Sequence, residues 1–178
     1  SDAQESYVLK KPPVTLSPDR LVSLYLEWLG KWPIKTLEDP LEQNDWDGWA
    51  RATAKIAGAG AQVVGDDFFA TNADRLKKGI ERRCATAVLV KPNQIGTLTE
   101  TLAVIDLAQR NRYGVILSHR AGDTSDTFIA DLAVAVDAAA VLFGLGARSR
   151  RRLLRPRARR RTGPARPRSR GRCDRSGG

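Results

Sequence analysis

Charged or polar side chains follow four short apolar runs of this sequence, and their types suit metal binding, proton transfer and anion binding. The runs start near residues 34, 62, 87 and 114, and the residues after them are Glu38, Asp66, Lys91 and Ser118-His119-Arg120. Regularly spaced apolar runs separated by helical segments are typical of βα repeats around a parallel sheet. The carboxyl ends of parallel strands share one edge of the sheet, where such folds build their active sites. We therefore expect these side chains to converge on one site.

The carboxylates of Glu38 and Asp66 are the candidate metal ligands. Mg²⁺ prefers oxygen ligands, and proteins bind it through one or two carboxylates together with substrate oxygens. Either acid alone is explained as well by a helix cap or a surface charge. Their matched positions at the ends of neighbouring predicted strands favour a Mg²⁺ site.

Lys91 is the candidate base, because burial beside other cations lowers the pKa of a lysine into a range useful for proton transfer. A structural ion pair with Glu38 or Asp66 explains its position equally well. Arg120 suits a phosphate or carboxylate group of a substrate, and its alternative is a surface salt bridge. His119 is the one histidine of the chain. Its place after an apolar run favours a role in the site over that of a satisfied polar group.

The rest of the pattern predicts the helices and strands that position these residues. Start signals and apolar residues at helical spacing predict helices, over residues 18–30, 45–57, 72–83, 97–111 and 127–138. Continuous apolar runs predict buried parallel strands, at residues 34–37, 62–65, 87–90, 114–117 and 139–143. The inward-facing residues are expected to include Trp28, Trp46, Trp49, Cys84, Leu98 and Leu102. The expected fold class is α/β, a barrel or a doubly wound sheet.

The net charge of +10 comes from the end of the chain. Residues 147–178 contain 14 arginines, no lysine and one acid, so they carry +13 and residues 1–146 carry −3. The tail has too few apolar residues for a core, and we expect it to be disordered. The expected organisation is therefore a folded part at 1–146 and a basic tail at 147–178.

Length and composition exclude several other classes of protein. The 178 residues suffice for one domain, and no apolar run is long enough to span a bilayer. Cys84 and Cys173 make neither a disulfide framework nor a zinc cluster, so a cytoplasmic location is expected. The chain starts at Ser1 and contains no methionine, and for that reason we expect it to be a fragment.

Several motifs of the chain resemble the C-terminal barrel domain of the enolase (phosphopyruvate hydratase) family. They are TLEDP at 36–40, DWDGW at 45–49, VVGDD at 63–67 with TN at 71–72, LVKPNQIGTLTETL at 89–102 and LSHRAGDTSDTFIADLAVA at 117–135. The resemblance runs from about residue 7 to residue 137, and the last two motifs are the most specific. It implies an incomplete TIM-type (βα) barrel of four to five repeats.

The resemblance also implies an activity, the reversible dehydration of 2-phosphoglycerate to phosphoenolpyruvate with Mg²⁺ as cofactor. Glu38 and Asp66 then correspond to two of the three Mg²⁺-binding carboxylates, and Lys91 to the base that removes the C2 proton. The loop that meets the substrate and its phosphate corresponds to Ser118, His119, Arg120 and Ala121. Active sites of the enolase superfamily combine a lysine or histidine base with one or two Mg²⁺ ions, which is the same arrangement. The full-length parent is expected to be a cytoplasmic homodimer, and full-length members of the family also occur at the cell surface.

The chain departs from the family pattern at several places. Ala121 replaces a serine that helps to hold phosphate, and Leu142 stands where the family has a substrate-binding lysine. The general acid glutamate and the third metal-binding aspartate lie upstream in the family. We therefore expect the 178-residue chain to be inactive alone, and a half-barrel to expose sheet edges that favour aggregation or a partner.

The tail at 147–178 has two interpretations. Arginine without lysine, together with Pro, Gly and Ala, is typical of GC-rich DNA translated out of frame, which is the interpretation we favour. The alternative is a genuine arginine-rich arm that binds RNA or DNA through phosphates. The competing functions are thus a nucleic-acid-binding protein on a degenerate barrel, or another member of the superfamily acting on a different carboxylate substrate.

Overall fold

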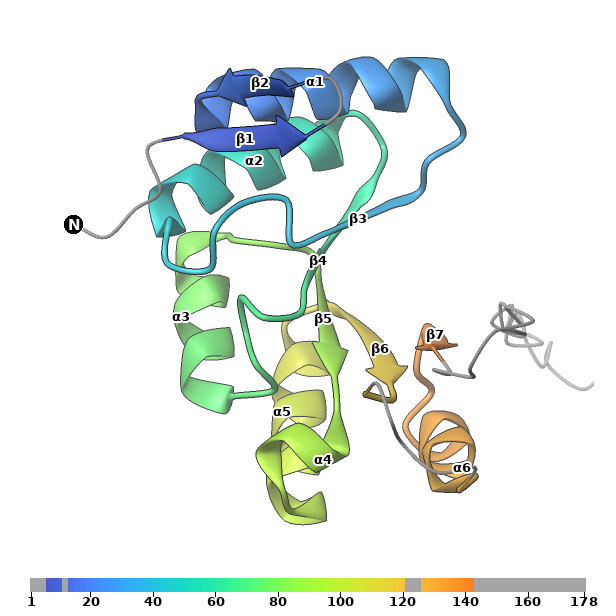
Figure 1. Ribbon diagram of the computed structural model, residues 1–178. Coiled ribbons are helices and arrows are strands. Elements are labelled where there is room, and N and C mark those ends of the chain that lie inside the picture. The colour runs from blue at the N-terminus through green and yellow to red at the C-terminus, as the bar shows by residue number, and fades with distance from the viewer. Residues whose placement is uncertain (1–5, 11–12, 121–125, 143–178) are drawn as a thin grey trace, which may run out of the picture.

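The computed structural model describes residues 6–10, 13–120 and 126–142, which form a parallel sheet with helices on one of its faces (Figure 1). The sheet has five strands in chain order, and each pairs in parallel with the next. They are β3 (Thr36–Glu38), β4 (Gln62–Gly65), β5 (Ala87–Val90), β6 (Gly114–Ser118) and β7 (Ala140–Leu142). Parallel strands in unbroken chain order are the arrangement of a (βα) barrel. The described chain is therefore half of such a barrel, which confirms the predicted fold class.

Helices connect the strands, and a hairpin precedes them. The helices are α1 (Pro18–Lys31), α2 (Trp46–Gly58), α3 (Ala73–Arg82), α4 (Pro92–Ile95), α5 (Leu98–Arg110) and α6 (Phe128–Ala135). The antiparallel hairpin consists of β1 (Tyr7–Lys10) and β2 (Pro13–Leu16). In Figure 1 the hairpin lies beside α1 and α2, while α5 lies against β5 and β6, and α3 packs on α5 and α2. None of the described helices is both long and apolar enough to cross a membrane.

Side chains of the central strands alternate between the two faces of the sheet, as the two-residue period of a strand requires. On the helix-covered face lie Val63, Val88, Val90, Val115 and Leu117. The opposite face carries Val64, Ala87, Leu89 and Ile116. Both faces are apolar, and this explains why each strand reads as a continuous apolar run. In a closed barrel the second of these faces is the interior.

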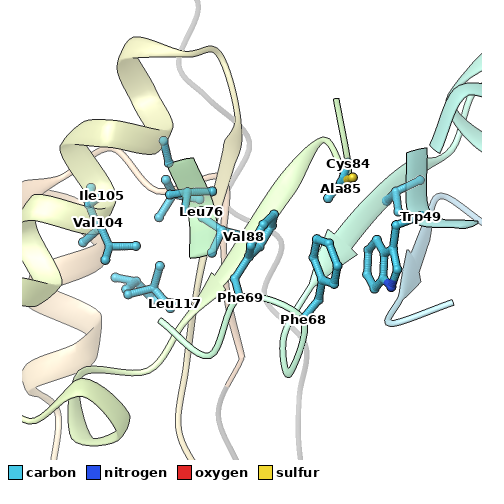
Figure 2. Packing of buried hydrophobic residues seen from close by; sticks show 14 of the residues in the cluster. Trp49, Phe68, Phe69, Leu76, Cys84, Ala85, Val88, Val104, Ile105 and Leu117 are labelled. Atoms are coloured by element: carbon cyan, nitrogen blue, oxygen red, sulfur yellow. The ribbon is translucent and has the colours of Figure 1, made fainter. Parts of the chain in front are cut away.

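A row of aromatic rings supports the segment that follows β4 (Figure 2). Trp49 of α2 stacks on Phe68, with ring centroids 3.8 Å apart, and Phe69 lies 4.8 Å further along the row. All three side chains are fully buried. Glycines leave room for the last ring, since a Cβ at Gly65 or Gly79 would lie within 2.5 Å of Phe69 carbon atoms. The segment after β4 is thus anchored in the core immediately beyond its strand.

The predicted helix starts are confirmed. The side chains of Ser17, Asn72 and Thr97 each accept a hydrogen bond from the backbone N–H three residues later, at 3.4, 3.0 and 3.2 Å. Such caps satisfy N–H groups that have no partner inside the helix. The caps fix where each helix leaves the strand before it.

The inward face of α5 was predicted only in part. Leu98 and Leu102 are 47% and 41% exposed, whereas inward positions were expected. The buried residues are Thr101, Val104, Ile105 and Ala108. Thr101 is accommodated because its hydroxyl donates a hydrogen bond to the carbonyl of Thr97, at 2.8 Å. Apolar residues occupy more than one face of this helix, so their spacing did not select the face that packs on β5 and β6.

Trp28 is also more exposed than expected, at 38%, while Trp46, Trp49 and Cys84 are buried as predicted. The Trp28 ring contacts Tyr25 on its own helix, 5.6 Å between centroids. Helix α1 packs on α2 and the hairpin rather than on the sheet, and this leaves part of its apolar surface in solvent.

Several boundaries differ from the predictions. The hairpin was not predicted, because prolines at 12 and 13 indicated a break, although proline is compatible with an edge strand. Pro92–Ile95 forms one helical turn where a turn was expected, and α6 ends at Ala135, three residues early. The strand predicted at 139–143 is present as β7. The sequence indicates a polar loop at 122–126, of which residues 122–125 lie outside the described residues, as does the tail at 147–178.

Candidate active site

Lys91 and Asp66 form a close ion pair at the carboxyl edge of the sheet. Nζ of Lys91 lies 2.6 Å from Oδ2 of Asp66, and the two side chains are only 15% and 12% exposed. Each residue directly follows the last residue of its strand, and the two strands are neighbours. The ion pair considered for Lys91 therefore exists, with Asp66 as its partner. The role of Lys91 as a base stays a prediction.

Asp39, which was not singled out from the sequence, holds the end of β4 from the neighbouring strand end. Its Oδ1 accepts the N–H of Asp66 at 2.9 Å, and its Oδ2 accepts the N–H of Asp67 at 2.8 Å. The backbone of Asp39 is left-handed, with φ 40°, a conformation that aspartate tolerates better than most residues. Burial raises the pKa of this carboxyl above its usual value, and the two hydrogen bonds from backbone N–H groups offset only part of that rise. Asp39 thereby fixes the main chain around Asp66.

The acidic side chains around Asp66 fit a divalent cation. Oδ1 of Asp66 is buried and accepts no hydrogen bond from any described residue. Oxygens of Asp39, Asp66 and Asp67 lie within 4.8 Å of one another. Glu38 belongs to the same electrostatic environment, since burial together with the negative charges of Asp66 and Asp39 raises the pKa of its carboxyl, while Lys91 lowers it. Clustered carboxylates, with one buried oxygen that accepts no hydrogen bond from the described residues, are an environment that Mg²⁺ stabilises.

Asp39 is less available than Asp66 to bind such a cation directly, and the roles of Glu38 and Asp66 as ligands stay predictions. Both oxygens of Asp39 already accept backbone hydrogen bonds. Asp67 is exposed. The only feature of the sequence that pointed to Asp67 as a site residue was its position next to Asp66. The role of Asp39 had a weaker signal, an acid between the predicted strand end and Pro40.

Ser118 and His119 line a pocket of about 280 Å³ at the end of β6. Its other lining residues are Pro92, Asn93, Asp126, Phe128 and Ile129. The Ser118 hydroxyl donates to the His119 carbonyl at 2.8 Å, and the His119 N–H donates to the carbonyl of Leu142 at 3.1 Å. This part of the predicted site thus borders α4, the short helix that follows Lys91.

The remaining predicted site residues are Arg120 and Ala121. Arg120 is exposed at the end of β6. Ala121 lies outside the described residues.

Comparison with known families agrees with this geometry. The family "Enolase, C-terminal TIM barrel domain" matches residues 2–155. The chain belongs to the enolase family. The match extends past residue 137, where the motifs recognised in the sequence end. Enolase from Mycobacterium leprae (strain TN) is 51% identical over 138 residues, which are 78% of this chain and 32% of that enolase.

The enolase-family chain therefore spans about a third of the length of this relative. The part that it spans includes the carboxyl edges of β3 to β7, where Glu38, Asp66 and Lys91 lie. The activity and substrates of a whole enolase are accordingly taken up as proposals.

Proposed function

We propose that this chain supplies the metal-binding and proton-abstracting part of an enolase active site. The reaction is the reversible, Mg²⁺-dependent dehydration of 2-phosphoglycerate to phosphoenolpyruvate. The observation that carries the proposal is the buried Lys91–Asp66 pair, in which one oxygen of Asp66 faces the lysine and the other accepts no hydrogen bond from the described residues. Membership of the enolase family supports the same assignment.

Lys91 is suited to hold and move the proton. The C2 proton of 2-phosphoglycerate is next to a carboxylate and therefore very weakly acidic, so its removal needs a base held within hydrogen-bond distance. Nζ of Lys91 is held at the sheet edge by Asp66 and is largely shielded from water. When bound, Mg²⁺ stabilises the additional negative charge that forms on the substrate carboxylate. Glu38 and Asp66 are the residues of this chain that would hold the metal ion.

The end of β6 is suited to the substrate phosphate. Ser118 and His119 line the pocket beside α4, and Arg120 follows them. An arginine and an imidazole are common ligands of phosphate oxygens. Ala121 supplies no hydroxyl there, so phosphate binding through this loop is expected to be weaker than with serine.

The experiment that tests the proposal places these residues in a complete enzyme. Residues 7–137 of this chain replace the matching segment of the M. leprae enolase, which keeps its own residue at the position of Leu142. Formation of phosphoenolpyruvate is followed by its absorbance. We expect Mg²⁺-dependent turnover that is lost in Lys91→Met. Lys55→Met is the matched control, since Lys55 pairs with Asp19 at 3.7 Å on the exposed surface. A folded chimera in which both variants retain equal turnover would contradict the role of Lys91.

The 178-residue chain alone is proposed to bind Mg²⁺ without turning over substrate. Titration calorimetry of the purified chain with MgCl₂ tests the first part, and the same absorbance assay tests the second. Turnover by the chain alone would show that the residues expected upstream are dispensable.

A further inference from the structure

Thr71, at the end of the segment that joins β4 to α3, makes two hydrogen bonds to the strand end that carries Lys91. Its Oγ1 accepts the backbone N–H of Lys91 at 3.0 Å and donates to Oε1 of Gln94 at 2.8 Å. The residue is fully buried. Rotation of the hydroxyl would therefore leave a buried group without a hydrogen-bond partner.

The backbone of Thr71 is held in an unfavourable conformation. Its φ is 52°, and that of the preceding Ala70 is 49°, both in the left-handed region. For a β-branched residue this region is a genuine outlier. Such conformations persist only where the surroundings determine them, and they cluster at functional sites.

The surroundings of Thr71 are rigid on both sides. The segment begins at Asp66, whose carbonyl accepts the N–H groups of Phe69 and Ala70 at 3.2 and 2.8 Å. Phe68 and Phe69 anchor its middle in the aromatic row of Figure 2. Both contacts to Lys91 therefore come from one short, tightly folded segment. Its first residue, Asp66, supplies the carboxylate that pairs with Nζ, and Thr71 near its end supplies the hydroxyl that binds the main-chain N–H.

We propose that Thr71 is a positioning residue that fixes Lys91 relative to Asp66. The proposal rests on the proposed function for the role of Lys91 as a base. The strain at Thr71 places the hydroxyl where it can bind the Lys91 N–H, and Gln94 orients the lone pair that receives it. The motif Thr71-Asn72 then has two separate tasks, since Asn72 caps α3 through the N–H of Arg75.

Three variants of the 178-residue chain test this proposal. Thr71→Val keeps the shape and the β-branch but removes both hydrogen bonds, and Thr71→Ser restores the hydroxyl. Thr53→Val is the matched control, because Thr53 is also buried and its Oγ1 accepts a backbone N–H, that of Ala85, at 2.8 Å. Ala85 lies before the start of β5, at the opposite end of that strand from Lys91.

The first readout is amide hydrogen exchange at Lys91, and the second is the rate at which acetic anhydride acylates its Nζ, both by mass spectrometry. Thr71→Val should lower protection of the Lys91 amide about tenfold, as expected for one lost hydrogen bond. It should also change the acylation rate of Lys91 relative to the other lysines, because the pair with Asp66 is no longer held in one geometry. Thr71→Ser should restore both values.

The control separates positioning from general destabilisation. Both valine variants should lower the melting temperature, but Thr53→Val should leave Lys91 acylation unchanged. Equal Lys91 acylation in Thr71→Val and Thr53→Val would overturn the proposal. A Mg²⁺ titration of the wild-type chain separates it from the proposed function: absence of Mg²⁺ binding with an intact Thr71→Val effect would refute the metal site and leave the positioning role standing.

Discussion

The two ends of the parallel sheet use left-handed residues for different purposes. At the amino-terminal end, Arg83, Arg112 and Asp137 have φ of 57°, 62° and 51°, and each lies just beyond a helix that leads into a strand. A left-handed residue is a common way to end a helix. At the carboxyl end, Asp39 and Thr71 come after strands, and their side chains hold the backbone of Asp66 and Lys91. At these five positions, left-handed residues end helices at one end of the sheet and hold the candidate site at the other.

The two ends of the sheet also differ in whether their buried polar side chains have hydrogen-bond partners. At the amino-terminal end, the hydroxyls of Thr53, Thr86 and Tyr113 bond to backbone groups at 2.8 to 2.9 Å. At the carboxyl end, Oδ1 of Asp66 is the buried side-chain atom without a partner among the described residues. Folding alone therefore explains the first end, whereas the second retains an unsatisfied oxygen. This difference predicts that substitutions at the carboxyl end affect ligand binding as well as stability.

The largest effect is expected for Phe68→Ala, which removes the ring that supports the carboxyl-end segment. Loss of a fully buried phenylalanine costs about 3–5 kcal/mol. Urea denaturation gives the free energy of unfolding, and titration calorimetry gives the Mg²⁺ affinity of the folded protein. Tyr113→Phe is the control at the other end. It removes the hydroxyl that donates to the Cys84 carbonyl at 2.9 Å and lies 3.5 Å from that of Gly79, at about 1 kcal/mol. If Tyr113→Phe weakened Mg²⁺ binding as much as Phe68→Ala, the two ends would not be functionally distinct.

Asp66→Asn is expected to have the next largest effect. The ammonium of Lys91 is left largely buried without its carboxylate, which costs about 3 kcal/mol. Mg²⁺ binding is expected to disappear, because an amide supplies one neutral oxygen in place of the charged ligand. Asp19→Asn is the control, because Asp19 pairs with Lys55 on the exposed surface. It should cost less than about 1 kcal/mol and leave Mg²⁺ binding intact. Unchanged Mg²⁺ affinity in Asp66→Asn would exclude Asp66 as a ligand.

Asp39→Ala should have a smaller effect on stability and a measurable one on metal binding. It removes two hydrogen bonds to the N–H groups of Asp66 and Asp67, at about 1 kcal/mol each. Loss of a group that orients a ligand typically weakens metal affinity about 10–100-fold. Asp39→Asn keeps one accepting oxygen and should give an intermediate affinity. An Mg²⁺ affinity equal to that of the wild type in Asp39→Ala would mean that Asp66 is positioned by other contacts.

The sequence was sufficient to place the strand ends but not the contacts between them. The segments after β4 and β5 could be located because apolar runs stop at Asp66 and Lys91, and the parallel order then brings both residues to one edge. Asp39 and Thr71 were not predicted from the sequence. Each holds a neighbouring strand end through a left-handed backbone conformation and side-chain hydrogen bonds to that strand end. Neither feature has a periodic signature.

Helix orientation shows the same limit. Spacing predicted the extent of α5 within one or two residues. However, Leu98 and Leu102 were placed inward, whereas Thr101, which was not, is buried with Val104, Ile105 and Ala108. A threonine becomes an inward residue when its hydroxyl finds a carbonyl of its own helix. That bond, to Thr97, belongs to the folded structure and not to the pattern of apolar residues.

The smallest expected effect is the pH dependence that Glu38 adds in the absence of divalent cations. Burial and the negative charges of Asp66 and Asp39 raise the pKa of Glu38 in the folded chain above its unfolded value. As the pH falls through this raised pKa, the folded chain takes up a proton before the unfolded chain does, so stability increases until the ordinary glutamate pKa is reached. Glu38→Gln should show a smaller increase in the urea midpoint, since Asp39, whose pKa burial also raises, remains. Glu81→Gln, on α3 and exposed, should retain the full increase. Saturating Mg²⁺ should reverse the sign for the wild type, because protons then compete with the metal ion for the same carboxylate. Identical pH profiles of the metal-free urea midpoint in the wild type and in Glu38→Gln would show that the pKa of Glu38 is not raised by folding.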